Sequence, residues 1–166
     1  MAKIDFSGID EYAKVLDALG KESEEIVKSA VYKGAALVAD EIKADLKALP
    51  IEEGENGLPP MGSPEHKLTG VSRRQKGDLI DGFGLAPIQN DDGYVQTKAG
   101  MDGYGSIATK KYPHGVPNVM LMRSIESGTS FREKHPIFRK ATNRARKKAE
   151  QAMREEIDDQ LKKRFR

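Results

Sequence analysis

A long apolar stripe constrains the fold of this 166-residue chain more than any other feature of its sequence. Between residues 22 and 48, six apolar residues recur at steps of three or four: Val27, Val31, Ala35, Val38, Ile42 and Leu46. This spacing predicts a long amphipathic helix over 22–48. Gly34 lies beside the stripe, where it would permit a close crossing by another element. Pro50 cannot continue the helix and is expected to stop it.

Two shorter helices are expected over 8–19 and 119–127, each with apolar residues at helical spacing. A strand is the alternative for 119–127, because that apolar run is short. The candidate N-caps are Ser7 and Asn118, and the glycines expected to end these helices are Gly20 and Gly128.

The clearest helical pattern is C-terminal, over residues 137–166. Its stripe consists of Phe138, Ala141, Ala145, Ala149, Ala152, Ile157 and Leu161. Because most of these residues are small, the helix is expected to approach another element closely. Lys162, Lys163 and Arg164 suit the negative end of the helix dipole.

Strand-forming residues are concentrated between 82 and 110. An apolar segment over 83–88 is followed by the strong turn sequence Asn90-Asp91-Asp92-Gly93 and by strand-type residues over 94–97. With a third strand at 104–109, these segments predict an antiparallel meander. The expected fold is therefore a single α+β domain over 1–166, with a small antiparallel β-sheet packed against long amphipathic helices.

Residues 49–80 differ from the rest of the chain, since they hold five Gly and four Pro and show no hydrophobic periodicity. A loop of this length inside a compact domain is uncommon, and is usually functional or disordered. We interpret 49–80 as a flexible arm that becomes ordered against a neighbour. A flexible insertion without a role is the alternative.

Charge is distributed unevenly although the net charge is only +2. Residues 132–166 contain 13 Lys or Arg against 6 Asp or Glu. Such asymmetry indicates a face for an acidic partner, although a solvated helix face has the same pattern. Nucleic-acid binding is a rival, because clustered positive charge suffices for phosphate contacts. The candidate clusters are Arg73, Arg74 and Lys76 in the loop, and Arg144, Arg146, Lys147 and Lys148 on the last helix.

The sequence contains no recognisable catalytic pattern, so an enzyme is not expected. The absence of Cys excludes thiolate chemistry and disulfides. His66, His114 and His135 have no metal-ligand spacing, and the acidic cluster Glu52, Glu53 and Glu55 is read as solvated loop charge. We therefore expect no cofactor and no metal. No signal peptide and no membrane span are expected either.

Five different short motifs occur along the chain in a characteristic order. They are Phe6-Ser7-Gly8-Ile9-Asp10-Glu11 with Leu16 and Leu19, Thr69-Gly70, Gly77-Asp78-Leu79, Glu126-Ser127-Gly128-Thr129, and Pro136-Ile137-Phe138 with Ala141. In this order the chain resembles the tail-component proteins of long-tailed phages and prophages, also described as head–tail joining or tail-completion proteins. It departs from that pattern at Ser127, where an aromatic residue is usual, at Lys140 in place of Pro, and in its longer loop.

The resemblance implies a non-enzymatic virion protein of the neck or tail end, present in the host cytoplasm before assembly. Members are expected to form rings, often six-fold, that contact connector or tail-tube proteins, with DNA only as a passing contact. The resemblance and the charged loop indicate an interface at Thr69, Gly70, Arg73, Arg74, Glu126, Gly128, Thr129, Pro136 and Phe138. Among these, Glu126 and Thr129 are predicted to stabilise a local corner between two helices.

Overall fold

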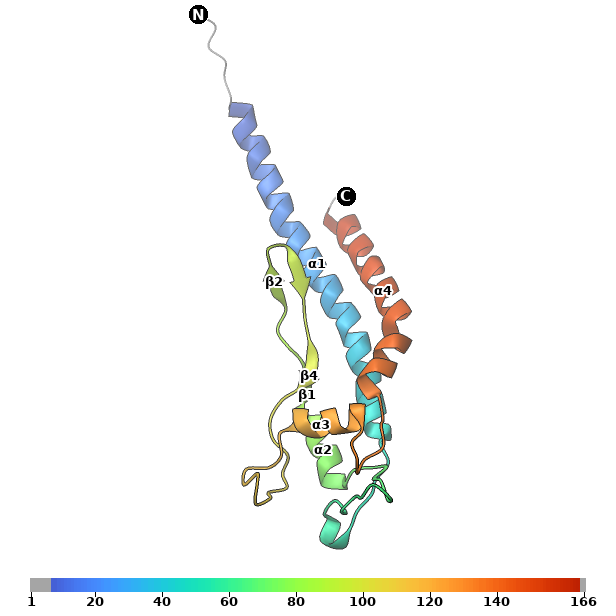
Figure 1. Ribbon diagram of the computed structural model, residues 1–166. Coiled ribbons are helices and arrows are strands. Elements are labelled where there is room, and N and C mark those ends of the chain that lie inside the picture. The colour runs from blue at the N-terminus through green and yellow to red at the C-terminus, as the bar shows by residue number, and fades with distance from the viewer. Residues whose placement is uncertain (1–6, 165–166) are drawn as a thin grey trace, which may run out of the picture.

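Helices and a hairpin of short strands make up the part of the chain that the computed structural model describes, which is residues 7–164, with side chains from residue 20 onward. In chain order the elements are α1 (Ser7–Ala48), the 3-10 turn η1 (Glu55–Gly57), α2 (Arg73–Gly82), β1 (Phe83–Leu85), β2 (Gln89–Asp91), β3 (Tyr94–Gln96), β4 (Ala99–Met101), α3 (Asn118–Ser127) and α4 (Ile137–Arg164). The expected α+β class is confirmed. Figure 1 shows α1 and α4 side by side and antiparallel, with the strands along another side of α1.

The N-terminal region forms one helix instead of the expected two. Gly20 does not end a helix at residue 19, and α1 continues through it. The Ser23 hydroxyl donates to the Gly20 carbonyl at 2.7 Å, within the helix. An interior Gly costs about 1 kcal/mol relative to Ala, which a helix of 42 residues can absorb. The expected Ser7 cap and the apolar face over 8–19 concern side chains outside the described set.

The buried face of α1 differs in part from the predicted stripe. Ile42 and Leu46 are buried as expected, but Val27 is 38% exposed. Ile26 and Ala30, which directly precede the predicted stripe residues Val27 and Val31, are buried instead. The difference follows from the position of α4, which packs along this side of α1 and brings Glu156 within 2.8 Å of the Ser29 hydroxyl, next to Ala30 in the chain. Ala141, Ala145 and Ala149 of the predicted α4 stripe are buried, as expected.

The strands form one interrupted hairpin, not a three-stranded meander. β2 pairs with β3, and β1 pairs with β4, both antiparallel. Between the ladders, the Ala86 amide donates to the Lys98 carbonyl at 2.7 Å. The expected turn is confirmed at its centre, where Asp92 and Gly93 both have positive φ, at 51° and 90°. That conformation matches the right-handed twist of paired strands and favours an Asp-Gly sequence.

The predicted third strand at 104–109 was wrong. Tyr104 forms only an isolated bridge with Pro117, and residues between them form a loop. β4, at Ala99–Met101, returns to β1 instead. Its Ala-Gly-Met composition carries little strand signal, which explains why the sequence did not predict it.

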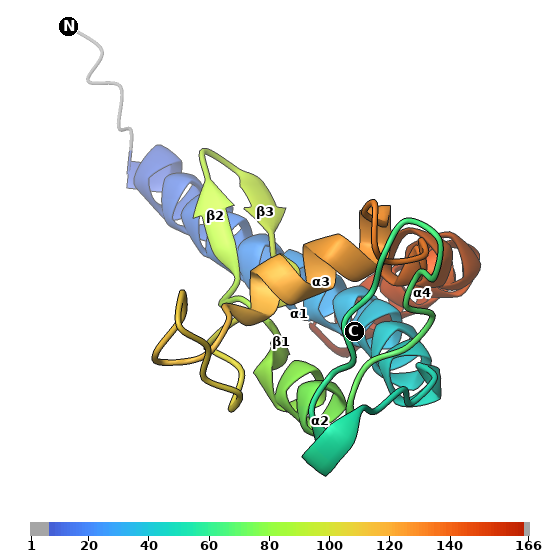
Figure 2. The same ribbon diagram turned by 60° about the horizontal axis from the view of Figure 1, so that its bottom comes forward.

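A single hydrophobic core lies where the C-terminal half of α1 meets α2, β1, α3 and the start of α4. Its buried residues are Ile42, Leu46, Leu49, Val71, Leu79, Phe83, Met122, Ile125, Ile137 and Ala141. Figure 2 shows α2 and α3 gathered around this end of α1. The two long helices therefore extend from the core as a pair.

The predicted loop 49–80 is a loop only in part, because residues 73–80 belong to α2. The helix begins with a capping box in which the Ser72 hydroxyl accepts from the Gln75 amide and the Gln75 side chain accepts from the Ser72 amide. Because α2 has few apolar residues, hydrophobic periodicity does not predict it. Residues before it are attached to the fold by a parallel bridge of Ile51 to Val71. The flexibility predicted for 49–80 remains a prediction.

Candidate functional site

The nine predicted interface residues fall into three groups that lie at the core end of the molecule. Glu126, Gly128, Thr129, Pro136 and Phe138 form the corner between α3 and α4. Thr69 and Gly70 lie in the preceding loop, where both donate their amides to Glu52, and the Gly70 carbonyl accepts from Arg132 of the corner segment. Arg73 and Arg74 form the exposed first turn of α2.

Glu126 links the two helices of the corner directly. Its carboxylate accepts hydrogen bonds from the amides of Phe138 at 3.0 Å and Arg139 at 3.1 Å. These amides belong to the first turn of α4, where N–H groups have no partner within the helix and the dipole is positive. The carboxylate therefore caps α4 from α3, the local role predicted for it.

Gly128 and Thr129 reverse the chain between the two helices. Gly128 has a φ of 73° and a ψ of 168°, a positive-φ conformation that essentially only Gly adopts. Thr129 and Arg132 exchange two backbone hydrogen bonds, at 3.0 and 3.4 Å. The Thr129 hydroxyl also accepts from the Phe131 amide at 3.3 Å. The corner is thus held by its own backbone, with Thr129 as a partner in these hydrogen bonds, and the stabilising role predicted for Thr129 stays a prediction.

Phe138 attaches the start of α4 to the sheet. Its ring meets the ring of Phe83 edge to face, with centroids 5.8 Å apart. Such aromatic pairs add about 0.5–1.5 kcal/mol beyond the area they bury. Pro136 stands one residue before α4, and its carbonyl accepts from the Lys140 amide at 3.2 Å.

Thr69 and Gly70 bind a carboxylate whose role the sequence did not indicate. Glu52 Oε2 accepts from the Thr69 amide at 2.8 Å and from the Gly70 amide at 2.9 Å. The Gly70 amide, followed by the Thr69 amide and hydroxyl, lowers the pKa of Glu52. Glu52 had been read as a solvated loop charge, and the structure corrects that interpretation.

Arg132 completes the connection between loop and corner. It is 5% exposed, and its guanidinium Nη1 donates to the Gly70 carbonyl. Burial lowers the pKa of Arg132, and the nearby Glu52 carboxylate opposes that effect. The Leu68 amide donates to the Phe131 carbonyl at 2.9 Å, so the loop lies beside the corner. We call Glu52, Thr69, Gly70, Glu126 and Arg132 the corner junction.

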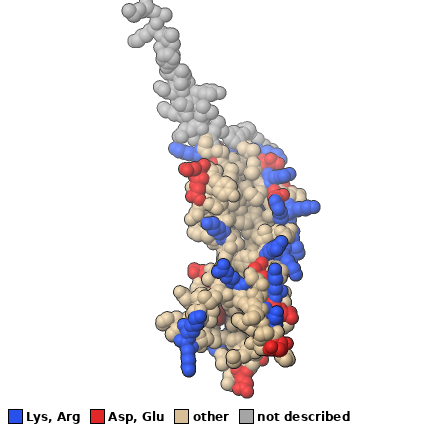
Figure 3. Space-filling model, viewed as in Figure 1, with Lys and Arg blue, Asp and Glu red and all other residues tan. Residues whose placement is uncertain are grey.

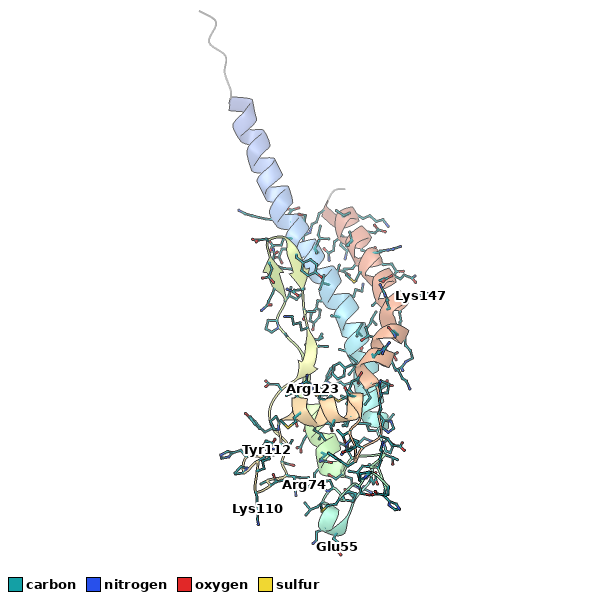
Figure 4. All side chains as sticks on the ribbon, viewed as in Figure 1. Glu55, Arg74, Lys110, Tyr112, Arg123 and Lys147 are labelled. Atoms are coloured by element: carbon teal, nitrogen blue, oxygen red, sulfur yellow. The ribbon has the colours of Figure 1, made fainter. Side chains whose placement is uncertain are left out.

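The side chains of Arg73 and Arg74 are exposed, and both residues form hydrogen bonds within the fold. The Arg73 amide donates to Glu53 at 2.9 Å, and Arg74 donates to the Ser106 carbonyl at 3.2 Å. Figure 4 shows Arg74 at the same end of the molecule as Glu55, away from the free end of α1. These contacts fix the loops around α2, and both side chains remain accessible from solvent.

A basic surface on α4 is the strongest charged feature. Residues 139–148 contain six Lys or Arg and no Asp or Glu. Figure 3 shows Lys and Arg side chains along the edge of the molecule formed by α4. Arg144 is paired within the fold, at 2.7 Å from Asp45 and 3.2 Å from Glu41. Part of this charge thus holds α4 on α1, and the rest faces solvent.

Neither a metal site nor a membrane-spanning helix is found in the part of the chain that the structure describes. No group of three His, Asp or Glu among residues 20–164, whose side chains are described, is arranged to hold a metal ion. Within the same part of the chain, no helix is both long and apolar enough to span a membrane. Comparison with known proteins gives no match, whether to family models, to curated proteins or to solved structures.

Proposed function

We propose that this chain is a structural virion protein of a long-tailed bacteriophage or prophage. It acts in head–tail joining or tail completion by forming an oligomeric ring at the neck or tail end. Its partners are further copies of itself and the connector or tail-tube proteins, and DNA is only a passing contact.

One observation carries the proposal: three motifs far apart in the sequence are linked at the α3–α4 corner. Glu126 accepts from the Phe138 amide, and Arg132, which lies between these two motifs, donates to the Gly70 carbonyl. Thr69-Gly70, Glu126 to Thr129, and Pro136 to Phe138 are three of the five motifs that carry the phage resemblance. Each has a defined structural part in joining loop, α3 and α4. These motifs therefore belong to one structural unit. This supports the resemblance to phage tail-component proteins over a chance succession of short matches.

The shape of the molecule is also compatible with a ring subunit. In both views of the ribbon, α1 extends beyond α4 and the hairpin (Figures 1 and 2). Exposed apolar residues occur at the opposite end, in the loop and corner, at Ile51, Leu58, Met61 and Phe131. Exposed apolar groups at an end of an elongated subunit suit contacts with rings above or below.

The experiment that tests this function is the solution mass of the purified full-length protein over a concentration series. It is run at low and high salt, with and without a DNA duplex. A monomer or small oligomer that gathers into one discrete ring without DNA is the expected result. A protein that remains monomeric at every concentration contradicts the proposal.

A DNA-associated phage accessory protein is the second candidate. It is favoured by the basic side chains of α4 that have no ion pair. This function predicts a mass shift only with the duplex and an affinity that falls steeply with salt.

A further inference from the structure

We propose that α4 of one copy docks against the strand hairpin of the next copy, so that the same contact repeats head to tail around a ring. The inference rests on the proposed function and names the two surfaces that would close the ring. α1 lies between the hairpin and α4 in Figure 1, and it contacts both of them. The two flanks of α1 therefore cannot neutralise each other within one copy.

The basic flank consists of Arg139, Lys140, Lys147 and Lys148. All four are exposed, and none has an ion pair within the described part of the chain. Arg139 and Lys147 lie opposite the buried Ala stripe at 100° per residue, so they project away from α1. Figure 4 shows Lys147 on the outer side of α4.

The acidic flank runs along the hairpin, from Asp81 and Asp102, which adjoin its β1–β4 end, to Asp91 and Asp92 at its turn. Residues 81–102 hold these four Asp against a single Lys. All four are exposed. Asp92 occupies the two-residue turn of the hairpin, where its positive φ places it at the tip. The hairpin thus presents a negative surface that its own α4 does not reach.

The geometry favours a heterologous contact. Lys147 lies at about the level of the β2–β3 hairpin along the molecule (Figure 4). A rotation about an axis parallel to α1 keeps that level, so it brings the basic flank of one copy to the acidic flank of the next. Two different surfaces that meet in this way generate rings when the rotation closes. Opposite charges also set the direction of docking and disfavour basic-to-basic contact.

The test compares the wild type with Lys147→Glu/Lys148→Glu. Each exposed pair contributes little, so the expected effect is an about tenfold higher concentration for half-assembly. The control is Lys162→Glu/Lys163→Glu, the same charge change on the same helix but outside the basic flank. It is expected to leave assembly unchanged. Helix content by circular dichroism and the Tm verify that both variants are folded.

A reciprocal variant distinguishes pairing from general charge effects. Asp91→Lys/Asp92→Asn should weaken assembly alone, and Asn is chosen because it tolerates the positive φ at position 92. Combining it with Lys147→Glu/Lys148→Glu should restore assembly toward the wild-type level, because every interface again joins opposite charges.

The outcomes distinguish this inference from the proposed function on which it rests. If the Lys147→Glu/Lys148→Glu variant forms the ring as well as the wild type does, the flank contact is overturned. The proposed ring itself then stands. Failure of the combined variant to recover also overturns it. Loss of duplex binding with unchanged assembly would assign the basic flank to nucleic acid instead. A wild type that never assembles overturns both the ring and its interface.

Discussion

Gly34 of α1 lies directly against Met153 of α4, and a β-carbon at position 34 would stand 2.6 Å from Met153 Cγ and 2.7 Å from Sδ. The close crossing expected from Gly34 is therefore present. Only the flexible Met153 side chain blocks the added carbon, because the nearest backbone atom, the Ala149 carbonyl oxygen, is at an ordinary 3.5 Å.

This relationship predicts a coupling between two substitutions. In a Met153→Ala background, Gly34→Ala should stabilise the protein by about 1 kcal/mol, because the helix gains a better helix former without a clash. In the wild-type background the gain should be smaller, since Met153 must move. Urea denaturation of the four variants in the cycle measures the difference. Equal gains in both backgrounds would contradict the contact.

Removing the carboxylate of Glu126 should loosen the start of α4. Glu126→Ala loses two hydrogen bonds to the helix N-terminus, so the free energy of unfolding should fall by about 1 kcal/mol. Glu133→Ala is the matched control, because Glu133 is an exposed neighbour with no hydrogen-bonded or ion-paired side chain in the described region. Unchanged Tm and unchanged assembly in Glu126→Ala would refute the capping role.

Acid should weaken the link between loop and corner. The pKa of Glu52 is lowered from 4.5 by the Gly70 and Thr69 amides, so its charged form stabilises the folded state above that value. This stability is lost as pH falls below about 4.5 toward the lowered pKa. The pH dependence of unfolding should be shallower in Glu52→Gln than in wild type. Glu55→Gln, at an exposed residue of the same loop, is the control.

Two glycines should respond to Ala in opposite directions. At Gly70 a β-carbon would lie 2.5 Å from the Pro50 carbonyl oxygen, a backbone atom that cannot step aside, so Gly70→Ala should destabilise by about 1–3 kcal/mol. At Gly77, inside α2, nothing lies within 4 Å, and Ala should stabilise by about 1 kcal/mol. Thermal unfolding of both variants checks the prediction, and the same sign for both would contradict it.

Amide exchange should divide the long loop into held and open parts. The amides of Glu52, Leu68 and Val71 donate to backbone carbonyls at 2.9–3.0 Å and should exchange slowly. Exposed residues such as Met61 and Glu65 should exchange fast. Uniformly slow exchange across 50–78 would refute the flexible arm, and uniformly fast exchange would refute its attachment to the corner.

Local patterns predicted much of the framework. The C-terminal helix, α3 and the Asp-Gly turn all follow from residues within a few positions of one another. α2 was missed because it has few apolar residues, although Ser72 and Gln75 have the spacing of a capping box. The link from Glu52 to Gly70 and Arg132 had no sequence signal, since these residues are up to 80 positions apart.

The sequence by itself determined that α3, α4 and the second half of α1 are helical and where the hairpin turns, because backbone preferences and apolar spacing act over a few residues. The tertiary structure decided the rest. It selected Ile26 and Ala30 over Val27 as the buried face of α1, since that is where α4 packs. It returned β4 to β1, buried Arg132 beside Gly70, and set opposite charges on the two flanks of α1. These outcomes depend on which surfaces meet, and no short stretch of sequence contains both surfaces.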